Sequence, residues 1–396
     1  MIRAVDLFCG GGGTSTGLAQ AAAALGKPLQ LTAINHWHTA VETHSRNHPD
    51  AEHLCADIDS LTPGKVVRGK LDLLVASPSC VQHSMARGNR TIDDQDRASA
   101  WCVVRWAESL RPRFICVENV SEWQKWGPLT LEGRPWKGRE GETFRAWVAA
   151  LESCGYRVAM RVLNAADFGD ATTRRRLFIL AWRGRGSALW PEETHAEHPG
   201  SDLFGPRSPW RAAREVIDWE IQGGSIFDRR KPLAAKTLQR IADGLRRFGG
   251  AAADPWLRML DGGAPEPADP VEPFMLGQQS GAVARPVSKP VPTVATSGAV
   301  SLIEPFVVSY YGTGGATATR QPLPTITTRD RFGLVEPRLA DIRFRMLQPH
   351  ELSAAQGFPA DYSFAGTKSE VVKQVGNSVP VGTARALCSG LLGRCA

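Results

Sequence analysis

The chain has 396 residues, a length that predicts two to three domains with a buried core. Hydrophobic residues make up 42% and charged residues 22%, which excludes general disorder, and no apolar run reaches the ~20 residues of a membrane span. The net charge of +7 suits a polyanionic partner without proving one. Residues 1–6 lack the order of a secretory signal, so we expect a cytoplasmic protein. The 8 cysteines form no CxxC pair and are expected to be reduced thiols.

The first 182 residues alternate short apolar runs with longer amphipathic stretches, which predicts strand-helix-strand units on a parallel sheet. A helix is predicted over residues 98–110, with Trp101, Val104, Ala107 and Leu110 on one face. The predicted fold class is therefore α/β, a doubly wound domain. The expected strands are residues 4–8, 31–35, 71–76, 114–118, 157–163 and 177–182.

After residue 182 the composition shifts to proline, glycine, alanine and threonine, which predicts a second, smaller domain over residues 183–341. Within it PVPT at 290–293 and LIEP at 302–305 return 32 residues later as PLPT and LVEP. Two copies predict paired strand-turn units in a β-rich lobe. Helical patterning returns near residue 342, so residues 342–396 are expected to complete the first domain, residues 1–182.

A glycine cluster, FCGGGGTSTGL at residues 8–18, directly follows the first predicted strand. Such a turn lets a ligand approach the N–H groups at the start of a helix, at the carboxyl ends of the strands. Dinucleotide enzymes and nucleoside-cofactor enzymes share this feature, and a tight structural turn has the same pattern. The cluster therefore predicts where a ligand binds and not which ligand it is.

Two further strand ends place reactive groups at the same edge. The segment SPSC, ending in Cys80, follows the strand at 71–76, and Glu118 ends the strand at 114–118. A lone cysteine is more often a small buried hydrophobe, and a glutamate at a strand end is often a helix cap. Because the ends of parallel strands meet in one crevice, we expect the thiol and the carboxyl group to face each other.

Three consecutive arginines enter the last strand of this block. Alternation along a strand sends Arg174 and Arg176 to one side and Arg175 to the other. Two guanidinium groups can then reach one site, although a solvated basic edge is the alternative interpretation.

Together these segments resemble the ordered motifs of DNA cytosine-5 methyltransferases. The resemblance spans nearly the whole chain, and residues 183–341 correspond to the variable target-recognition domain of that family. It implies a Rossmann-like methyltransferase domain with a β-rich target-recognition domain. The motifs are Asp6-Leu7-Phe8-Cys9-Gly10 with Gly12, Ser77-Pro78-Ser79-Cys80 with Ser84, Glu118-Asn119-Val120, Arg174-x-Arg176, Gln356-Gly357-Phe358-Pro359 and Gln374-Val375-Gly376-Asn377-Ser378-Val379-Pro380.

The resemblance implies methyl transfer from S-adenosylmethionine to C5 of a cytosine flipped out of double-stranded DNA at a specific sequence. Cys80 is then the nucleophile that adds to C6 of the ring. Glu118 acts at N3 and the exocyclic amine, and Arg176 holds O2. Arg174 orders the thiol loop or contacts a phosphate.

The resemblance also implies the cofactor site. Trp37 stands where the family stacks an aromatic ring on adenine, and Asp57 where it contacts the adenine amine. His36 stands where the family usually has a glutamate for the ribose, so a modified S-adenosylmethionine donor is an alternative. Ser79-Cys80-Val81 and Thr172 also depart from the family pattern. The expected cofactor-binding residues are Phe8, Cys9, Gly10, Gly12, His36, Trp37, Asp57, Ile58, Pro78, Asn377 and Ser378.

Two other functions remain as alternatives. A catalytically silent DNA-binding regulator on the same fold is expected to lose Cys80, Glu118 or Arg176, and none is lost. A nicotinamide-dependent oxidoreductase predicts an acidic residue where His36 stands and leaves the arginine pair unexplained.

The expected partners are double-stranded DNA and a cognate restriction endonuclease, with the chain acting as a monomer. No metal is expected, because His44 and His48 are the one histidine pair at helical spacing and no HExxH pattern accompanies them. The segment 83–97, which carries three arginines, is predicted to close over flipped DNA, with an ordinary charged loop as the alternative.

Overall fold

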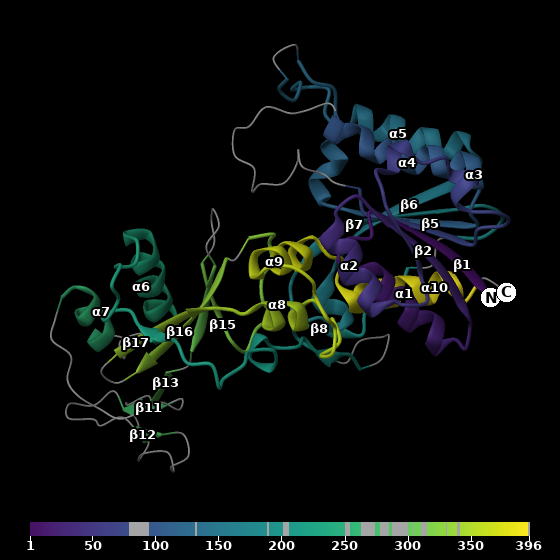
Figure 1. Ribbon diagram of the computed structural model, residues 1–396. Helices are drawn as coiled ribbons and strands as arrows, with labels where there is room; N and C mark the ends of the chain where they lie inside the picture. The colour runs from purple at the N-terminus through teal and green to yellow at the C-terminus, as the bar shows by residue number, and fades with distance from the viewer. Residues whose placement is uncertain are drawn as a thin grey trace. The chain divides into compact units, whose positions relative to one another are not determined.

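The computed structural model divides into two compact units (Figure 1). Unit 1 comprises Met1–Arg211, Thr325–Arg329 and Ser353–Ala396, and unit 2 comprises Ala212–Pro324 and Asp330–Leu352. Compactness assigns no function to either unit, so the two functional domains expected from the sequence, residues 1–182 completed by 342–396 and residues 183–341, stay predictions. The structure describes residues 1–78, 95–130, 133–187, 190–200, 206–249, 254–262, 274–277, 285–286, 300–303, 305–309, 315–329, 331–338 and 341–394.

Unit 1 is built on a seven-stranded sheet of order β3-β2-β1-β4-β5-β7-β6. The five strands from β3 to β5 pair in parallel, whereas β7 runs antiparallel to both β5 and β6. The predicted α/β fold is confirmed. The strand β3 was not predicted, because it has four residues and begins with polar Glu52 and His53. The strands are β1 (Ile2–Leu7), β2 (Leu29–Asn35), β3 (Glu52–Cys55), β4 (Leu73–Ala76), β5 (Phe114–Asn119), β6 (Arg157–Asn164) and β7 (Arg175–Trp182).

Helices cover both faces of this sheet (Figure 1). On one face α4 and α5 bury Trp106 and Trp147 against β-branched and leucine side chains of the strands. On the other face α1 and α10 bury Leu18 and Leu387. Two short strands, β8 (His195–Ala196) and β9 (Ser208–Pro209), pair with each other outside the main sheet. The helices of unit 1 are α1 (Gly13–Ala24), α2 (His38–Asn47), η1 (Ile58–Ser60), α3 (Pro63–Val66), α4 (Gln95–Leu110), η2 (Ser121–Lys125), α5 (Glu142–Ser153), η3 (Ala165–Phe168), α9 (Lys368–Asn377) and α10 (Val381–Leu392).

The buried face of α4 matches the predicted face in part, since Ala107 is fully buried and Val104 and Leu110 pack against the core. Trp101 is 37% exposed, whereas Val103 and Trp106 are fully buried. The helix carries apolar residues at consecutive positions, so two of its faces have similar hydrophobicity and periodicity alone does not separate them. Packing decides between them, because the indole N–H of Trp147 on α5 donates to the carbonyl of Ala100 at 2.8 Å.

The C-terminal helix α10 completes the face of the sheet that α1 covers. A Cβ added at Gly17 would lie 2.6 Å from Ala384 Cβ, so the two helices pack at the closest distance that glycine allows. Asp170, just after η3, accepts hydrogen bonds from the backbone N–H groups of Gly382 at 3.0 Å and Thr383 at 3.1 Å. It therefore caps the first turn of α10. Burial raises the pKa of Asp170 to about 7.

Removal of this cap is predicted to destabilise unit 1. Asp170→Ala leaves buried N–H groups without acceptors and is expected to lower the free energy of unfolding by about 2–3 kcal/mol in urea denaturation. Asp170→Asn keeps one acceptor oxygen and is expected to lose less. Asp361→Ala, at an exposed position, serves as the control. Equal stability of the Asp170→Ala and Asp361→Ala variants would contradict the role of the cap.

Unit 2 contains a five-stranded antiparallel sheet of order β10-β17-β16-β14-β15 and a three-stranded sheet of order β12-β11-β13. The predicted β-rich second lobe is confirmed. Its described elements are β10 (Gly224–Ser225), α6 (Ala235–Gly249), α7 (Asp254–Leu260), β11 (Phe274–Gly277), β12 (Arg285–Pro286), β13 (Val300–Ile303), β14 (Phe306–Ser309), β15 (Ala316–Ala318), β16 (Phe332–Arg338) and β17 (Asp341–Met346), with η4 (Ala213–Glu215); α8 (Pro349–Ala355) begins in unit 2 and ends in unit 1.

The helix α6 was not predicted, although the sequence carries a signal for it. Leu238, Ile241 and Leu245 recur at helical spacing, and the last two are buried against Phe306 of β14. A Cβ at Gly244 would collide with the same phenyl ring, so this glycine lets α6 lie close to the sheet.

The internal repeat does not form paired units. Residues 302–303 lie in β13 of the three-stranded sheet, whereas residues 334–337 lie in β16 of the five-stranded sheet. Residues 290–293 lie outside the described residues. The second copy of the proline motif contains the fully buried Leu323. The predicted pairing of the two copies is therefore wrong for their strands, because each strand pairs with neighbours of its own sheet.

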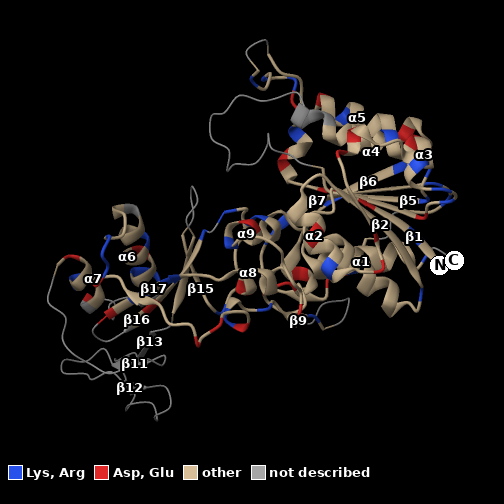
Figure 2. Cartoon of the chain, viewed as in Figure 1, with Lys and Arg blue, Asp and Glu red and all other residues tan. Residues whose placement is uncertain are grey.

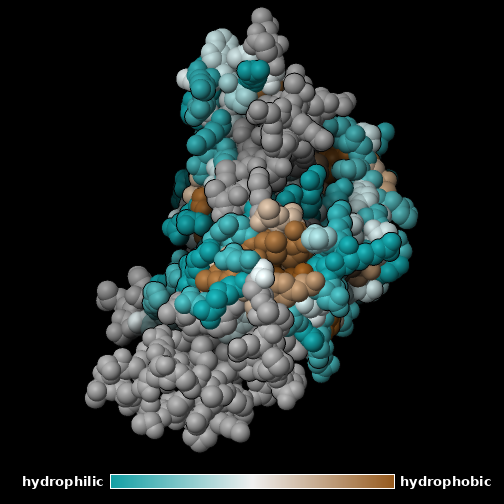
Figure 3. All heavy atoms as spheres, turned by 90° about the vertical axis from the view of Figure 1, so that its left-hand side faces the viewer, coloured by the Kyte–Doolittle hydropathy of each residue, from teal (hydrophilic) through white to brown (hydrophobic). Residues whose placement is uncertain are grey.

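The surface in Figure 3 is mostly hydrophilic where it is described, with hydrophobic side chains gathered in one central patch. Within the described part of the chain, no helix is both long and apolar enough to cross a membrane.

Candidate active site

The glycine turn between β1 and α1 adopts backbone conformations that side chains rarely allow. Phe8, Gly10 and Gly12 have φ angles of 63°, 52° and 90°. A Cβ at Gly12 would collide with the hydroxyl of Tyr362, so glycine is required there. At Gly10 a Cβ would meet, among the described residues, only the Phe8 carbonyl oxygen, at 3.8 Å. The protein therefore covers the backbone of the turn at Gly12, whereas the described residues leave the backbone at Gly10 accessible.

The segment after β4 begins beside this turn. The backbone N–H of Ser77 donates to the carbonyl of Leu7 at 3.2 Å. The side-chain amide of Asn119, at the end of β5, donates to the carbonyl of Pro78 at 3.2 Å. These bonds join the carboxyl ends of β1, β4 and β5. Residues 79–94 lie outside the described residues, and they include Cys80 and most of the segment 83–97 that is expected to close over DNA.

Glu118 and Arg176 form an ion pair at this edge. The Nε of Arg176 lies 3.2 Å from Oε1 of Glu118, and both side chains are largely buried. Burial lowers the pKa of Arg176, and the carboxylate of Glu118 acts in the opposite direction. An Arg–carboxylate pair shielded from water places hydrogen-bond donors and acceptors side by side with fixed geometry.

Arg174 directly precedes β7 and lies near Arg176, whereas Arg175, between them, is exposed. Arg174 is only 4% exposed, and its Nη1 donates to the carbonyl of Ile326 at 2.9 Å. Burial and the neighbouring Arg176 lower the pKa of Arg174. A buried side chain has little surface for a DNA phosphate. The contact joins Arg174 to residue 326, and its expected role, ordering the thiol loop or contacting a phosphate, stays a prediction.

The expected cofactor residues follow the carboxyl ends of other strands. Trp37 follows β2, and the Nζ of Lys373 lies 4.4 Å from the centre of its ring. His36 is exposed, and so is Asp57, which caps η1 by accepting from the N–H of Asp59 at 3.0 Å. Ile58 is buried.

At the opposite side of the turn, α9 ends at Asn377, which is exposed. Ser378 is buried, and its hydroxyl donates to the carbonyl of Gln374 at 2.8 Å. A Cβ at Gly13 would collide with the carbonyl oxygen of Val379, the residue that follows Ser378. The described residues of the expected cofactor site therefore surround one edge of the sheet, and their binding role stays a prediction.

Sequence reasoning gave no role to Asp6, which lies directly below the glycine turn. Asp6 is buried and accepts a hydrogen bond from the hydroxyl of Ser15 at 2.6 Å. Burial raises the pKa of Asp6 to about 7, and the buried Asp6 carboxylate adds to the burial that raises the pKa of the Cys9 thiol. Cys9 is therefore a buried thiol and not a reactive one.

Three histidines form a cluster behind the turn. Nδ1 of His44 lies 2.8 Å from Nε2 of His53, and the rings of His44 and His48 lie 4.6 Å apart. Nε2 of His48 lies 3.1 Å from the hydroxyl of Thr16, which donates to the carbonyl of Gly12. For His44 and His48, the sequence analysis considered only a role as metal ligands. Among the described residues, no three His, Cys, Asp or Glu side chains are arranged to hold a metal ion.

Burial lowers the pKa of all three histidines, that of His48 to about 4. Between about pH 6.5 and pH 4 the unfolded chain therefore binds a proton at His48 that the folded chain does not. This difference lowers the stability of the fold as the pH falls.

His48→Gln is predicted to flatten the pH dependence of stability. The amide of glutamine can still donate to Thr16, but it does not titrate. Relative to the wild type, the variant should gain up to about 1.4 kcal/mol of unfolding free energy for each pH unit lowered through this window, measured by urea denaturation. His198→Gln, at an exposed position, is the control. An unchanged slope in His48→Gln would show that His48 titrates alike in both states.

Known proteins share both the sequence and the fold of this chain. A model of the C-5 cytosine-specific DNA methylase family matches residues 2–203 and 287–392. The Type II methyltransferase M.Sau3AI of Staphylococcus aureus is 28% identical over 191 residues, 46% of this chain and 43% of that protein. M1.HphI of Haemophilus parahaemolyticus is 30% identical over 200 residues, 49% of each chain. The chain thus spans about half the length of the curated relatives it matches, or less.

The fold is similar to that of two Dnmt2 proteins. The crystal structure of S. pombe Dnmt2 methyltransferase superposes with a TM-score of 0.59 and 15% identity over 100% of this chain and 99% of that one. DNMT2 of Spodoptera frugiperda gives a TM-score of 0.59 and 14% identity, over 99% of this chain and 100% of that one. At this identity the likeness concerns the fold alone. Because the family model covers well over half of the sequence, the chain belongs to the C-5 cytosine-specific DNA methylase family.

Proposed function

We propose that this protein transfers a methyl group from S-adenosylmethionine to C5 of cytosine in double-stranded DNA. The observation that carries the proposal is the buried ion pair of Glu118 and Arg176, held at the strand ends next to the open glycine turn. Membership of the family supports the same reaction. A cognate restriction endonuclease is proposed as a functional companion, since the relatives are named Type II methyltransferases.

The ion pair suits the pairing edge of cytosine. That edge carries an amine that donates, followed by N3 and O2, which accept. The carboxyl group of Glu118 can contact the amine and N3, and the guanidinium of Arg176 can donate to O2. In a duplex this edge is paired with guanine, so the target base has to leave the stack before the two side chains can reach it.

Cys80, which the family motif assigns as nucleophile, follows Pro78 by two residues. Its thiolate forms a bond to C6, and the electrons of the C5=C6 bond shift toward N3 and O2. A proton donated by the carboxyl group of Glu118 to N3 and a hydrogen bond from Arg176 to O2 stabilise this charge, and C5 becomes nucleophilic toward a methyl group. The proton returns from N3 to Glu118 when the ring is restored. After a base removes the C5 proton, the C5=C6 bond reforms and the thiolate leaves C6. The ring is then aromatic again and the enzyme is regenerated.

The residues around the turn fit the proposed cofactor. The open position at Gly10 lets a ligand lie against the backbone, the Trp37 ring offers a stacking surface, and Asp57 offers a carboxylate for an amine. When bound there, S-adenosylmethionine supplies an electrophilic methyl group.

The reaction is tested by incubation of purified protein with unmethylated bacterial DNA and S-adenosylmethionine, followed by mass spectrometry of the nucleosides. The proposal predicts 5-methyldeoxycytidine, and sequencing of the same DNA then identifies the recognised site. Salt-sensitive DNA binding without modification would favour a silent regulator instead. A different added mass with another donor would favour a modified cofactor.

Cys80→Ser is predicted to abolish methyl transfer and to leave DNA binding largely intact, because a serine hydroxyl is a far weaker nucleophile than a thiolate. Transfer is measured by the mass-spectrometric assay and binding by fluorescence anisotropy. Cys55→Ser, at an exposed cysteine, is the matched control and should keep full activity. Full turnover by Cys80→Ser would rule out this nucleophile.

Glu118→Gln is predicted to reduce the transfer rate about 100-fold or more, since the amide cannot supply a proton at N3. The substitution keeps the size of the side chain, so the variant should still fold. Glu152→Gln, at an exposed position on α5, is the control. If Glu118→Gln retained the wild-type rate, the contact at N3 would not contribute to catalysis.

A further inference from the structure

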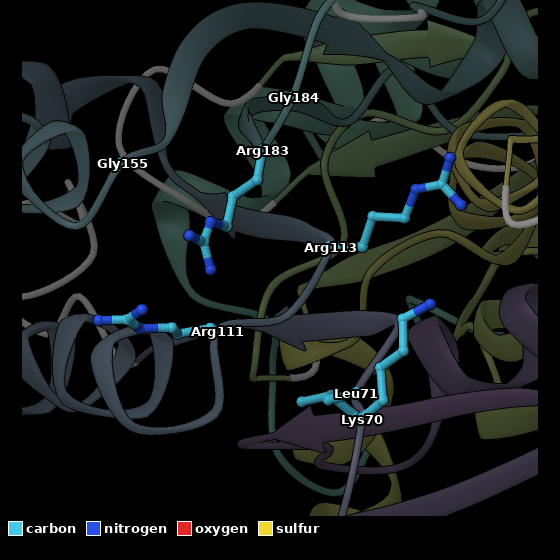
Figure 4. Close-up of a pocket in the computed structure, with 7 residues that line it drawn as sticks. All are labelled: Lys70, Leu71, Arg111, Arg113, Gly155, Arg183 and Gly184. Atoms are coloured by element: carbon cyan, nitrogen blue, oxygen red, sulfur yellow. The ribbon is translucent and has the colours of Figure 1, made fainter.

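A basic hollow lies at the end of the sheet opposite to the candidate active site. It has a volume of about 450 Å³ and is lined by Lys70, Leu71, Arg111, Arg113, Gly155, Arg183 and Gly184 (Figure 4). These residues precede β4, β5 and β6 or follow the antiparallel β7, so they all belong to the amino edge of the parallel strands. Figure 2 shows Lys and Arg segments gathered at this end of the sheet.

The hollow is held rigidly by backbone contacts between its loops. The N–H of Arg113 donates to the carbonyl of Leu71, and the N–H of Arg183 donates to the carbonyl of Arg113, both at 3.2 Å. The hydroxyl of Tyr156 donates to the carbonyl of Pro112 at 2.8 Å. The cations therefore project from a fixed frame, which reduces the entropy lost when an anion binds.

The charge of the hollow is almost uncompensated. No carboxylate belongs to the seven residues that line it, and among the described residues one ion pair involves them, between Lys70 and Asp72 at 3.8 Å. The guanidinium groups of Arg113 and Arg183 lie over the rings of Phe114 and Tyr156, and neither forms an ion pair with a residue that the structure describes. An exposed set of unpaired arginines attracts anions.

The backbone at Arg111 is strained in a way that favours a functional role. Arg111 has a φ of 47°, in the left-handed region, and its N–H donates to the carbonyl of Ala107 at the end of α4. Glycine is the residue that usually ends a helix in this conformation. An arginine at this position accepts the strain and brings a charge to the hollow.

We propose that this hollow is a second binding site for nucleic-acid phosphates, separate from the site that holds the target base. In Figure 4 Arg111 and Arg183 extend to one side of the hollow and Arg113 and Lys70 to the other. Such a spread fits a row of phosphates along a strand better than one small anion at a single point. The identification of the occupant as duplex DNA rests on the proposed function.

The two sites do not share one short duplex. From Arg113 to Glu118 the chain runs along β5 for five residues, about 17 Å at 3.3 Å for each residue of a strand, and the sites open at opposite ends. Duplex DNA is stiff over far longer distances than this. The second site therefore binds another duplex or a distant part of a long one.

The proposal predicts that the protein binds two equivalents of a 14-base-pair duplex, the second of them weakly and with strong salt dependence. The Arg111→Gly/Arg183→Ser double variant should bind the second duplex at least tenfold more weakly, with a salt slope reduced by roughly two. Fluorescence anisotropy and native mass spectrometry measure affinity and stoichiometry. Arg111→Gly relieves backbone strain, so its thermal midpoint should equal or exceed that of the wild type.

Arg46→Ser/Arg139→Ser is the matched control. It removes the same charge at two exposed positions where each arginine is paired with a glutamate, Glu42 or Glu142. Loss of the second duplex in both double variants would reveal a general charge effect and overturn the proposal. Binding of one duplex by the wild type, or of two by the Arg111→Gly/Arg183→Ser variant, would also overturn it. Binding of pyrophosphate at the hollow without a second duplex would assign the site to small phosphate compounds instead.

The methylation assay separates this proposal from the proposed function. If the protein binds two duplexes but methylates none, the hollow stands and the reaction fails. If it methylates DNA but binds one duplex, the reaction stands and the hollow fails.

Discussion

The glycine turn of the candidate active site depends on a hydrogen bond from the far end of the chain. The hydroxyl of Tyr362 donates to the carbonyl of Gly11 at 2.7 Å, across 351 residues of sequence. Val379 and Ala384 lie so close to α1 that any side chain at Gly13 or Gly17 would collide with them. The turn, the helix that follows it and the strand ends beside it therefore take their positions only when the last segment of the chain has packed.

Most of the sheet of unit 1 could be predicted from sequence because buried strands are apolar and bounded by polar loops. The exceptions have physical reasons. The short β3 has no apolar run, and the direction of β7 depends on how it pairs with β5 and not on its own residues. Trp101 is exposed because α4 has two apolar faces, of which only packing against α5 selects one. The spacing of Leu238, Ile241 and Leu245 was available in the sequence and would have predicted α6.

The candidate site was predictable to a different degree. Parallel strands bring their carboxyl ends together, so the position of Glu118 near the glycine turn followed from its place in the sequence. Contacts between distant segments did not follow. The bond of Arg174 to Ile326 and the grouping of His44, His48 and His53 depend on loops whose paths sequence patterns do not describe. Such residues become interpretable only with the tertiary structure.

Arginine serves two different purposes at the two ends of the sheet. At the carboxyl edge Arg176 is buried and paired with a carboxylate, which fixes its direction and removes its long-range field. At the amino edge Arg111 and Arg183 are exposed and lack acidic partners among the residues that line the hollow. A paired, shielded arginine binds a ligand through hydrogen bonds of fixed geometry. An unpaired, exposed arginine attracts anions over a longer distance, and salt weakens this attraction.

Because α1 packs against α10, its buried face stays uncovered until the ribosome has synthesised the end of the chain. A ribosome that adds 5–20 residues each second needs roughly 20 to 70 s to extend the chain from α1 to α10. During this interval the face that α1 will bury against α10 stays uncovered. That face consists largely of Gly17, Leu18, Ala21 and Ala22, of which only the leucine is large and apolar. Small side chains expose little apolar surface, so the uncovered face of α1 gives nascent chains little surface for aggregation. The same glycine and alanines that permit tight packing against α10 therefore also reduce aggregation during synthesis.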